Sequence, residues 1–244
     1  MGTELGPQAE LAQDFSATAQ EISTLYPNPP MEFLFSGNAG TIHDFRSSEQ
    51  RKKIGVPTNC GVVANKNQEI MTTNVVGCAA LYLKGTNSNI FVHLTPNSEK
   101  GLGYRYWREK NRDELAQASA DKVMASVPEE EDKSSIQGII VINVGSETGG
   151  DYDYRKIRAD ADRYARLLEE AGIANVKVVE VPLASTSVYA TPEKPGKLFV
   201  CGADTEIEPD GRLHSKKIAK GFWVDIDPDQ NVEYVKHGII EKAA

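Results

Sequence analysis

A succession of short, β-branched apolar segments separated by polar turn clusters is the feature that most restricts the fold of this chain. From Gly61 onward the sequence reads GVVA, IMTTNVVGCAALYL and NIFVHLTP, with the clusters NKNQ and KGTNSN between these segments. Segments of this kind, bounded by turn residues, are typical of β-strands. The region therefore predicts three successive strands, joined by tight connections.

Two later stretches predict helices. Residues 104–127 read as a helix that ends before Pro128. The second helix has apolar residues at spacings of four, three, four and three, and a glycine follows where a helix C-terminus requires one. Its apolar face is Ile157, Ala161, Tyr164, Leu168 and Ala171, with Gly172 after it.

The remaining segments predict further strands: IQGIIVINVG, VKVVEVPL, then TSVYAT and GKLFVCG joined by PEKPG, and a final hairpin of FWVDI with VEYVKHGII around PDQN. Because strands outnumber helices, we expect an α+β fold, with a layered, β-sandwich-like core of mostly antiparallel strands flanked by helices. We expect one domain over 1–244, with a helix or arm at 1–50, a catalytic core at 51–204 and a hairpin extension at 205–244. The polar stretch 37–59 and the acidic run 129–132 are expected to be surface segments.

Composition restricts the partners. The formal net charge is −8 and the sequence pI is about 5.2, which argues against nucleic acid as a partner. No apolar run approaches the roughly 20 residues of a membrane span, and no secretory signal is visible. The three cysteines lack metal-site and disulfide spacing, so we expect free thiols in a reducing compartment. We expect a cytoplasmic protein, or one delivered into a host cell without such a signal.

Cys78 and His93 are the candidate reactive pair. If Lys84–Asn87 form a four-residue loop, Cys78 lies opposite His93, and if the loop is only Thr86–Asn87, Cys78 lies diagonal to His93. In both registers the two side chains share one face, with Cβ atoms roughly 5–8 Å apart. A free Cys or a lone His in a strand is more often structural, but a thiol and an imidazole this close can share a proton and generate a thiolate nucleophile.

The segment around this pair resembles the active-site region of the CheD-like glutamine deamidases, which include the chemoreceptor deamidase CheD, the cytotoxic necrotizing factors and the Burkholderia lethal factor. The resemblance rests on T-T-N-V-V-G-C followed by F-V-H-L-T-P, with Thr72 six residues before Cys78. Weaker similarity in element order extends over about 61–202. The G-G-x-x-G-R stretch of CheD has no counterpart, and Val75 and Val76 stand where the toxins have L-S. These departures concern the substrate more than the chemistry.

The resemblance implies deamidation of glutamine side chains in a protein substrate, and its toxin members extend this expectation to a bacterial toxin or effector. Cys78 would be the nucleophile and His93 the base, Thr72 would orient the imidazole, and the Cys78 N–H, with Gly77 before it, would support the oxyanion. No cofactor or metal is implied. An amine in place of water would make the same site a transglutaminase.

Other patterns provide alternatives. Cys60 with His43 could form a second dyad, although a structural thiol is the default reading. The loop 145–150 lies between a strand and a helix and could bind a nucleotide or metabolite in a non-catalytic protein, but it lacks the phosphate-binding motifs. Asp225, Asp227 and Asp229 lack the rest of a calcium loop. We assign no partner to His214 or His237.

Overall fold

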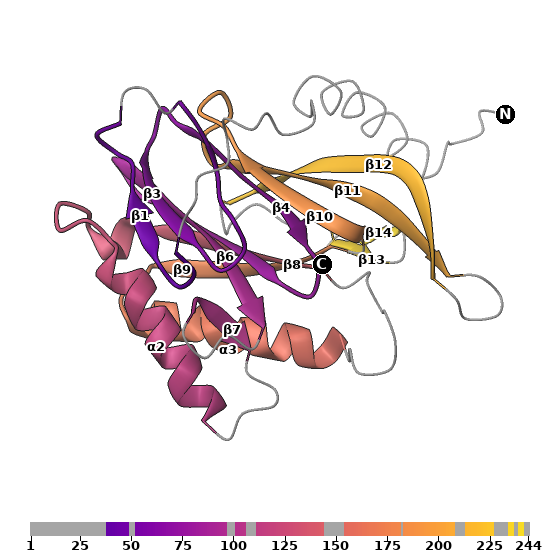
Figure 1. The fold of residues 1–244 in the computed structure, drawn as a ribbon, viewed down its shortest axis with the longest axis horizontal. Coiled ribbons are helices and arrows are strands. Elements are labelled where there is room, and N and C mark those ends of the chain that lie inside the picture. The colour runs from indigo at the N-terminus through magenta and orange to yellow at the C-terminus, as the bar shows by residue number, and fades with distance from the viewer. Residues whose placement is uncertain are drawn as a thin grey trace, which may run out of the picture.

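Two stacked β-sheets and two helices form the architecture (Figure 1). The computed structural model describes residues 38–48, 52–96, 101–105, 111–143, 154–181, 183–207, 213–226, 234–236 and 239–241. The helix expected near the N-terminus and the 145–150 loop lie outside these residues. The α+β class and the layered sheet core are confirmed.

The larger sheet has seven strands and contains β3, β5 and β6 of the predicted β-rich region. The segment IMTTNVVGCAALYL, expected to be one strand, is divided into β4 in the smaller sheet and β5 in the larger, because the backbone turns at Asn74 and Gly77. Its order is β1 (Ile42–Asp44), β3 (Gly61–Asn65), β6 (Ser88–Pro96), β5 (Ala79–Lys84), β8 (Gln137–Asn143) and β9 (Asn175–Val181), and β7 (Gly103–Arg105) pairs with the far end of β6. Pairing is antiparallel through the centre, between β3, β6, β5 and β8, and parallel at β1–β3, β6–β7 and β8–β9.

The second sheet has five strands, in the order β12 (Leu213–Asp225), β11 (Lys197–Ile207), β10 (Leu183–Ala190), β4 (Glu69–Val75) and β2 (Lys53–Gly55). All its pairs are antiparallel except β2–β4. A separate two-stranded ribbon joins β13 (Tyr234–Lys236) to β14 (Ile239–Glu241). The sheets are therefore mixed, not purely antiparallel.

The helices cover the face of the larger sheet that is turned away from the smaller one (Figure 1). Helix α3 (Tyr154–Glu170) buries the predicted apolar face, and Gly172 has the left-handed φ of 108° that its position requires. Helix α2 (Arg112–Ala125) begins later than expected, because Gly103–Arg105 pairs with β6 as a strand. Among the described helices, none combines the length and apolar character needed to cross a bilayer.

Strand β8 explains how the core is divided. Its apolar run is continuous, and the structure buries both of its faces. Ile140 and Ile142 pack toward the helices, whereas Ile139 and Val141 pack between the two sheets. A strand enclosed on both faces needs no polar alternation.

Two further sequence predictions about strands are wrong. Strands β1 and β2 lie inside the polar stretch expected to be a surface connection; each is a short edge strand, where polar side chains can remain in solvent. Among the described residues, segment 222–225 pairs with β11, where Trp223 is opposite Phe199, and the C-terminal strands β13 and β14 pair with each other. The partner is the preceding strand: β11 and β12 form a hairpin that pairs from Ile207 with Leu213 to Lys197 with Asp225, so both strands extend beyond the apolar segments that predicted them.

Candidate functional site

The β5–β6 hairpin places Cys78 beside His93. Ala80 is paired with His93 and Lys84 with Asn89, so the connection is the tighter of the two expected loops, and the Gly85 N–H donates to the Ser88 carbonyl at 2.9 Å. Cys78 directly precedes β5 and therefore lies opposite Thr95 and diagonal to His93. Cys78 packs with Ala80 in the core between the sheets, the face that His93, opposite Ala80, shares.

Glu131 holds this hairpin in register. Its carboxylate accepts hydrogen bonds from the backbone N–H groups of Thr86, Asn87 and Ser88 at 2.7–2.8 Å and from the Ser88 hydroxyl at 2.9 Å. The side chain is buried, so the expectation that the whole acidic run is solvated is wrong for this residue. Burial alone would raise the pKa of Glu131, but these hydrogen bonds outweigh it and lower the pKa.

Thr72 contacts His93 from the opposite sheet. Its Oγ1 lies 2.7 Å from His93 Nδ1 and donates its single proton to the Val56 carbonyl at 2.8 Å. Oγ1 must therefore accept from Nδ1–H, which leaves the lone pair of the neutral ring on Nε2. Nε2 is buried and has no hydrogen-bond partner among the described residues. The imidazole is held in the tautomer that can accept a proton at Nε2.

Burial sets the protonation states of the pair. It raises the pKa of the Cys78 thiol to about 11, against a smaller lowering effect of a backbone hydrogen bond from Val76. It lowers the pKa of His93 to about 4. At neutral pH burial therefore favours a neutral thiol beside a neutral imidazole, and not the preformed thiolate expected from the sequence.

The four residues before Cys78 have an unusual backbone. Asn74 and Gly77 adopt left-handed φ values of 59° and 64°, and the β4–β10 pairing is irregular between Thr186 and Val188. Asparagine and glycine are the residues that tolerate this conformation best. Val76 is 37% exposed and is the one large hydrophobic side chain exposed among the described residues. Gly77 was expected to permit close approach, and the structure shows in addition that it needs a positive φ.

Sequence reasoning missed three buried polar residues around the pair. Asn143 ends β8, and its Nδ2 donates to the Val75 carbonyl at 3.0 Å and to Thr186 Oγ1 at 2.9 Å. The Tyr104 hydroxyl donates to the Gly77 carbonyl at 3.2 Å. A polar residue at the end of the apolar run of β8 was the available signal for Asn143. Tyr104 was assigned to a helix, and Thr186 carries no local signal.

Cys60 is also close to His93, but its thiol is less accessible. The Cys60 carbonyl accepts from the His93 N–H at 2.9 Å, and its Sγ donates to the Asn38 carbonyl at 3.6 Å. Cys60 is 1% exposed and Cys78 is 9% exposed. The alternative partner His43 pairs along the backbone with Val62 and stacks on Phe45. Both residues are buried, and Cys78 has the larger exposed fraction of the two.

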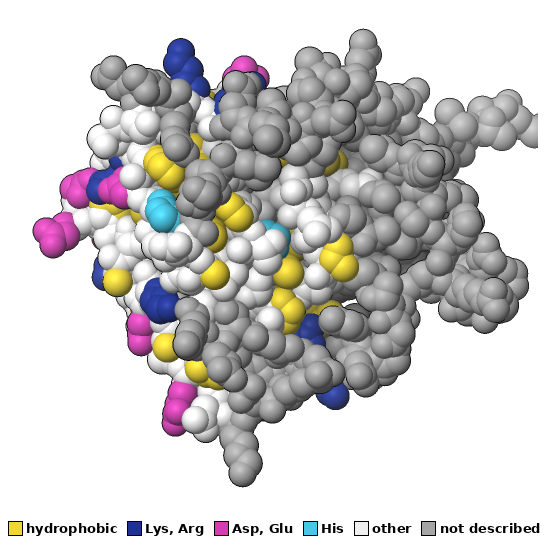
Figure 2. All heavy atoms as spheres, viewed as in Figure 1, with side chains coloured by type: hydrophobic (Ala, Val, Ile, Leu, Met, Phe, Trp, Pro, Cys, Tyr) yellow, Lys and Arg dark blue, Asp and Glu magenta, His cyan; other side chains and the backbone are white. Residues whose placement is uncertain are grey.

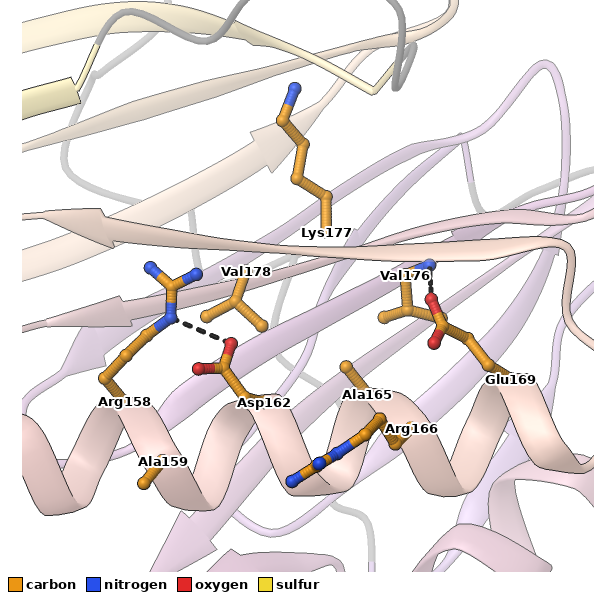
Figure 3. Close-up of a pocket in the computed structure, with 9 residues that line it drawn as sticks. All are labelled: Arg158, Ala159, Asp162, Ala165, Arg166, Glu169, Val176, Lys177 and Val178. Atoms are coloured by element: carbon orange, nitrogen blue, oxygen red, sulfur yellow. Dashed lines mark hydrogen bonds and ion pairs between the residues drawn. The ribbon is translucent and has the colours of Figure 1, made fainter. Parts of the chain in front are cut away.

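A cleft of about 550 Å³ lies elsewhere, between α3 and β9 (Figure 3). Three of its charged lining residues have partners: Arg158 pairs with Asp162 and with Glu180, and Glu169 accepts from the Val176 N–H at 2.9 Å. Figure 3 shows Lys177 pointing away from the helix. The cleft is on the helix side of the larger sheet, whereas the Cys78 site is between the sheets.

No group of three or more His, Cys, Asp or Glu side chains in the described part of the chain lies where it could hold a metal ion. The His214 side chain, the 145–150 loop, His237, Asp227 and Asp229 lie outside the part described in this detail. Comparisons of the sequence with models of known protein families and with curated proteins find no match.

Proposed function

We propose that this protein is a cysteine-dependent protein-glutamine deamidase, with Cys78 as nucleophile, His93 as general base and Thr72 as the residue that orients the imidazole. The hydrogen bond between Thr72 Oγ1 and His93 Nδ1 carries the proposal, since it fixes the tautomer that a base needs and comes from the residue six positions before Cys78. A purely structural His would not need an acceptor nitrogen left without a partner.

The chemistry follows from these groups. His93 Nε2 takes the proton from the Cys78 thiol while sulfur attacks the carboxamide carbon, because burial disfavours a charged pair before substrate arrives. The tetrahedral oxyanion is held by backbone N–H groups, that of Cys78 among them. Collapse expels ammonia, which receives the proton from Nε2. Water, deprotonated by the same nitrogen, then hydrolyses the thioester to glutamate and frees the thiol.

The access to the thiol suits a slender side chain. Cys78 is only 9% exposed, and the exposed apolar side chain of Val76 stands two residues before it. A glutamine side chain on the surface of a partner protein is slender enough to bring its terminal carboxamide to a thiol of such low exposure while the rest of the partner stays outside. On the face presented in Figure 2, basic and acidic side chains of the described residues are interspersed and form no continuous basic stripe. We favour a protein over nucleic acid as substrate for this reason and because of the net charge of −8.

The setting of the reaction is part of the same proposal. Cys60, Cys78 and Cys201 are free thiols, as a reducing cytoplasm would keep them. The resemblance to toxin deamidases extends the proposal to an effector that acts on a host protein.

The experiment measures ammonia release and intact mass in a panel of candidate proteins treated with the enzyme. Deamidation adds about one dalton to the substrate through the thioester intermediate. Cys78→Ala should abolish both signals while Cys201→Ala leaves them intact, since Cys201 lies in the cluster with Met71, Tyr189 and Phe199 on the smaller sheet and not between the sheets. Activity retained by Cys78→Ala and lost in Cys60→Ala would move the nucleophile to Cys60.

The same assay separates the alternatives. Addition of a primary amine tests the transglutaminase reading, in which the substrate gains the mass of the amine less that of the ammonia released, in place of the small gain from hydrolysis. A non-catalytic binding protein would release no ammonia, and iodoacetamide would label Cys78 no faster than the buried Cys60 and Cys201.

A further inference from the structure

Two buried side chains hold the backbone just before the nucleophile, and the dyad chemistry does not itself require either. The Val75 carbonyl accepts from Asn143, and the Gly77 carbonyl accepts from Tyr104. We propose that Tyr104 and Asn143 are positioning residues that fix the Gly77–Cys78 and Val75–Val76 peptide units and so aim the Cys78 N–H at the oxyanion. This inference rests on the proposed function, because an oxyanion forms only if Cys78 attacks a carbonyl.

The Tyr104 contact determines where the Cys78 N–H points. The Gly77 carbonyl and the Cys78 N–H belong to one peptide unit, which is trans, so they point in opposite directions. Tyr104 is fully buried in the core between the larger sheet and the helices, and its hydroxyl draws the carbonyl toward that side. The N–H is thereby directed toward the other side, the space between the sheets, where Thr72 meets His93. Burial also raises the pKa of Tyr104, which keeps its hydroxyl protonated as a donor.

Asn143, on β8, holds the Val75–Val76 peptide unit. The last pair of β5 and β8 is Ala79 with Ile142, so Asn143 lies one position further, opposite Cys78. Its Nδ2 bridges the Val75 carbonyl and Thr186 of the smaller sheet. With the Val75 carbonyl fixed, the Val76 N–H points the opposite way and donates to the Asn74 carbonyl at 2.9 Å. The Val75 carbonyl at the end of β4 and the Gly77 carbonyl between β4 and β5 are thus each held by a buried side chain.

Positioning of the oxyanion donor can be separated from general damage by two probes of Cys78. Acylation by p-nitrophenyl acetate passes through a tetrahedral oxyanion and releases p-nitrophenolate. Alkylation by iodoacetamide displaces iodide at a saturated carbon and forms no oxyanion. Both reactions need the thiol and its base, but only acylation needs the aimed N–H.

Tyr104→Phe deletes the hydroxyl and retains the ring. We expect its acylation rate to fall about 10- to 100-fold, below the loss for removal of a complete oxyanion donor, with the alkylation rate and its pH profile unchanged. Tyr164→Phe is the matched control: it deletes the hydroxyl of another fully buried tyrosine in the same cluster, 3.0 Å from Ser119 Oγ, and should leave both rates unchanged. Asn143→Ala should show the same divergence of the two rates, together with a lower melting temperature.

Three outcomes would contradict the positioning role of Tyr104 and Asn143. Wild-type acylation rates in both Tyr104→Phe and Asn143→Ala would overturn the positioning role and leave the proposed function standing. An equal fall of acylation and alkylation would also overturn it, since that indicates a disordered site. A wild-type protein that p-nitrophenyl acetate does not acylate at Cys78 would overturn the proposed function itself, and the positioning role with it.

Discussion

Replacement of Thr72 by Val tests the dyad most directly, because one oxygen atom satisfies two buried groups. The Thr72 hydroxyl donates to the Val56 carbonyl and accepts from His93 Nδ1–H, and Val56 and His93 are 4% and 0% exposed. Valine keeps the branched shape and removes the oxygen. Each buried polar group left without a partner costs about 1–3 kcal/mol. Because two groups lose their partner, the free energy of unfolding should fall by about 2–4 kcal/mol, with the Val56 carbonyl contributing less of this loss than the His93 Nδ1–H.

The same substitution should reduce turnover. Without an acceptor at Nδ1 the ring can exchange tautomers or rotate, and the fraction of molecules with a free lone pair on Nε2 decreases. We expect kcat to fall about 10- to 100-fold, less than the loss on removing a triad carboxylate, because threonine contributes no charge. Thr72→Ser restores the oxygen and should recover most of the rate.

The assay is urea unfolding at pH 7 together with ammonia release, and Thr73→Val is the control. Thr73 is the next residue of β4 and is only half-buried, so its loss should change stability by less than about 1 kcal/mol. If Thr72→Val is as stable and as active as Thr73→Val, the hydrogen bond between Thr72 and His93 has neither role. If Thr72→Ser fails to recover activity, shape and not the hydroxyl is what matters.

Two further predictions concern pH and the hairpin. Because the unfolded imidazole binds a proton near pH 6.5 and buried His93 only near pH 4, acid favours the unfolded state: stability should fall by up to about 3 kcal/mol between these pH values. Relative to wild type, His93→Gln should lose this pH dependence in urea titrations, whereas His43→Gln should keep it. Glu131→Ala should cost about 2 kcal/mol at pH 7 and broaden the amide NMR signals of the β5–β6 turn. The exposed neighbour Glu129→Ala serves as its control, and equal stability of the two variants would disprove the role of Glu131.

Local pattern was sufficient for several elements. The α3 face, its terminal Gly172 and the β10–β11 hairpin were predictable, because helix periodicity, glycine at positive φ and a proline-containing turn are properties of short segments. The shared face of Cys78 and His93 was equally predictable. A hairpin of either loop length gives that result, because side chains alternate with period two.

Partners that are distant in the sequence could not be predicted. The register of the β5–β6 hairpin depends on Glu131, which lies 43 residues after Ser88. The Val75 carbonyl depends on Asn143, 68 residues further along the chain.

The sequence by itself determined the strand-rich core, the main amphipathic helix and the candidate residues Thr72, Cys78 and His93. The tertiary structure decided that Thr72 meets His93 from a different sheet, that both side chains are buried, and that burial favours a neutral pair over a thiolate. The physical reason is that periodicity records which face a side chain occupies. Hydrogen-bond partners and desolvation depend instead on what the other sheet brings to that face.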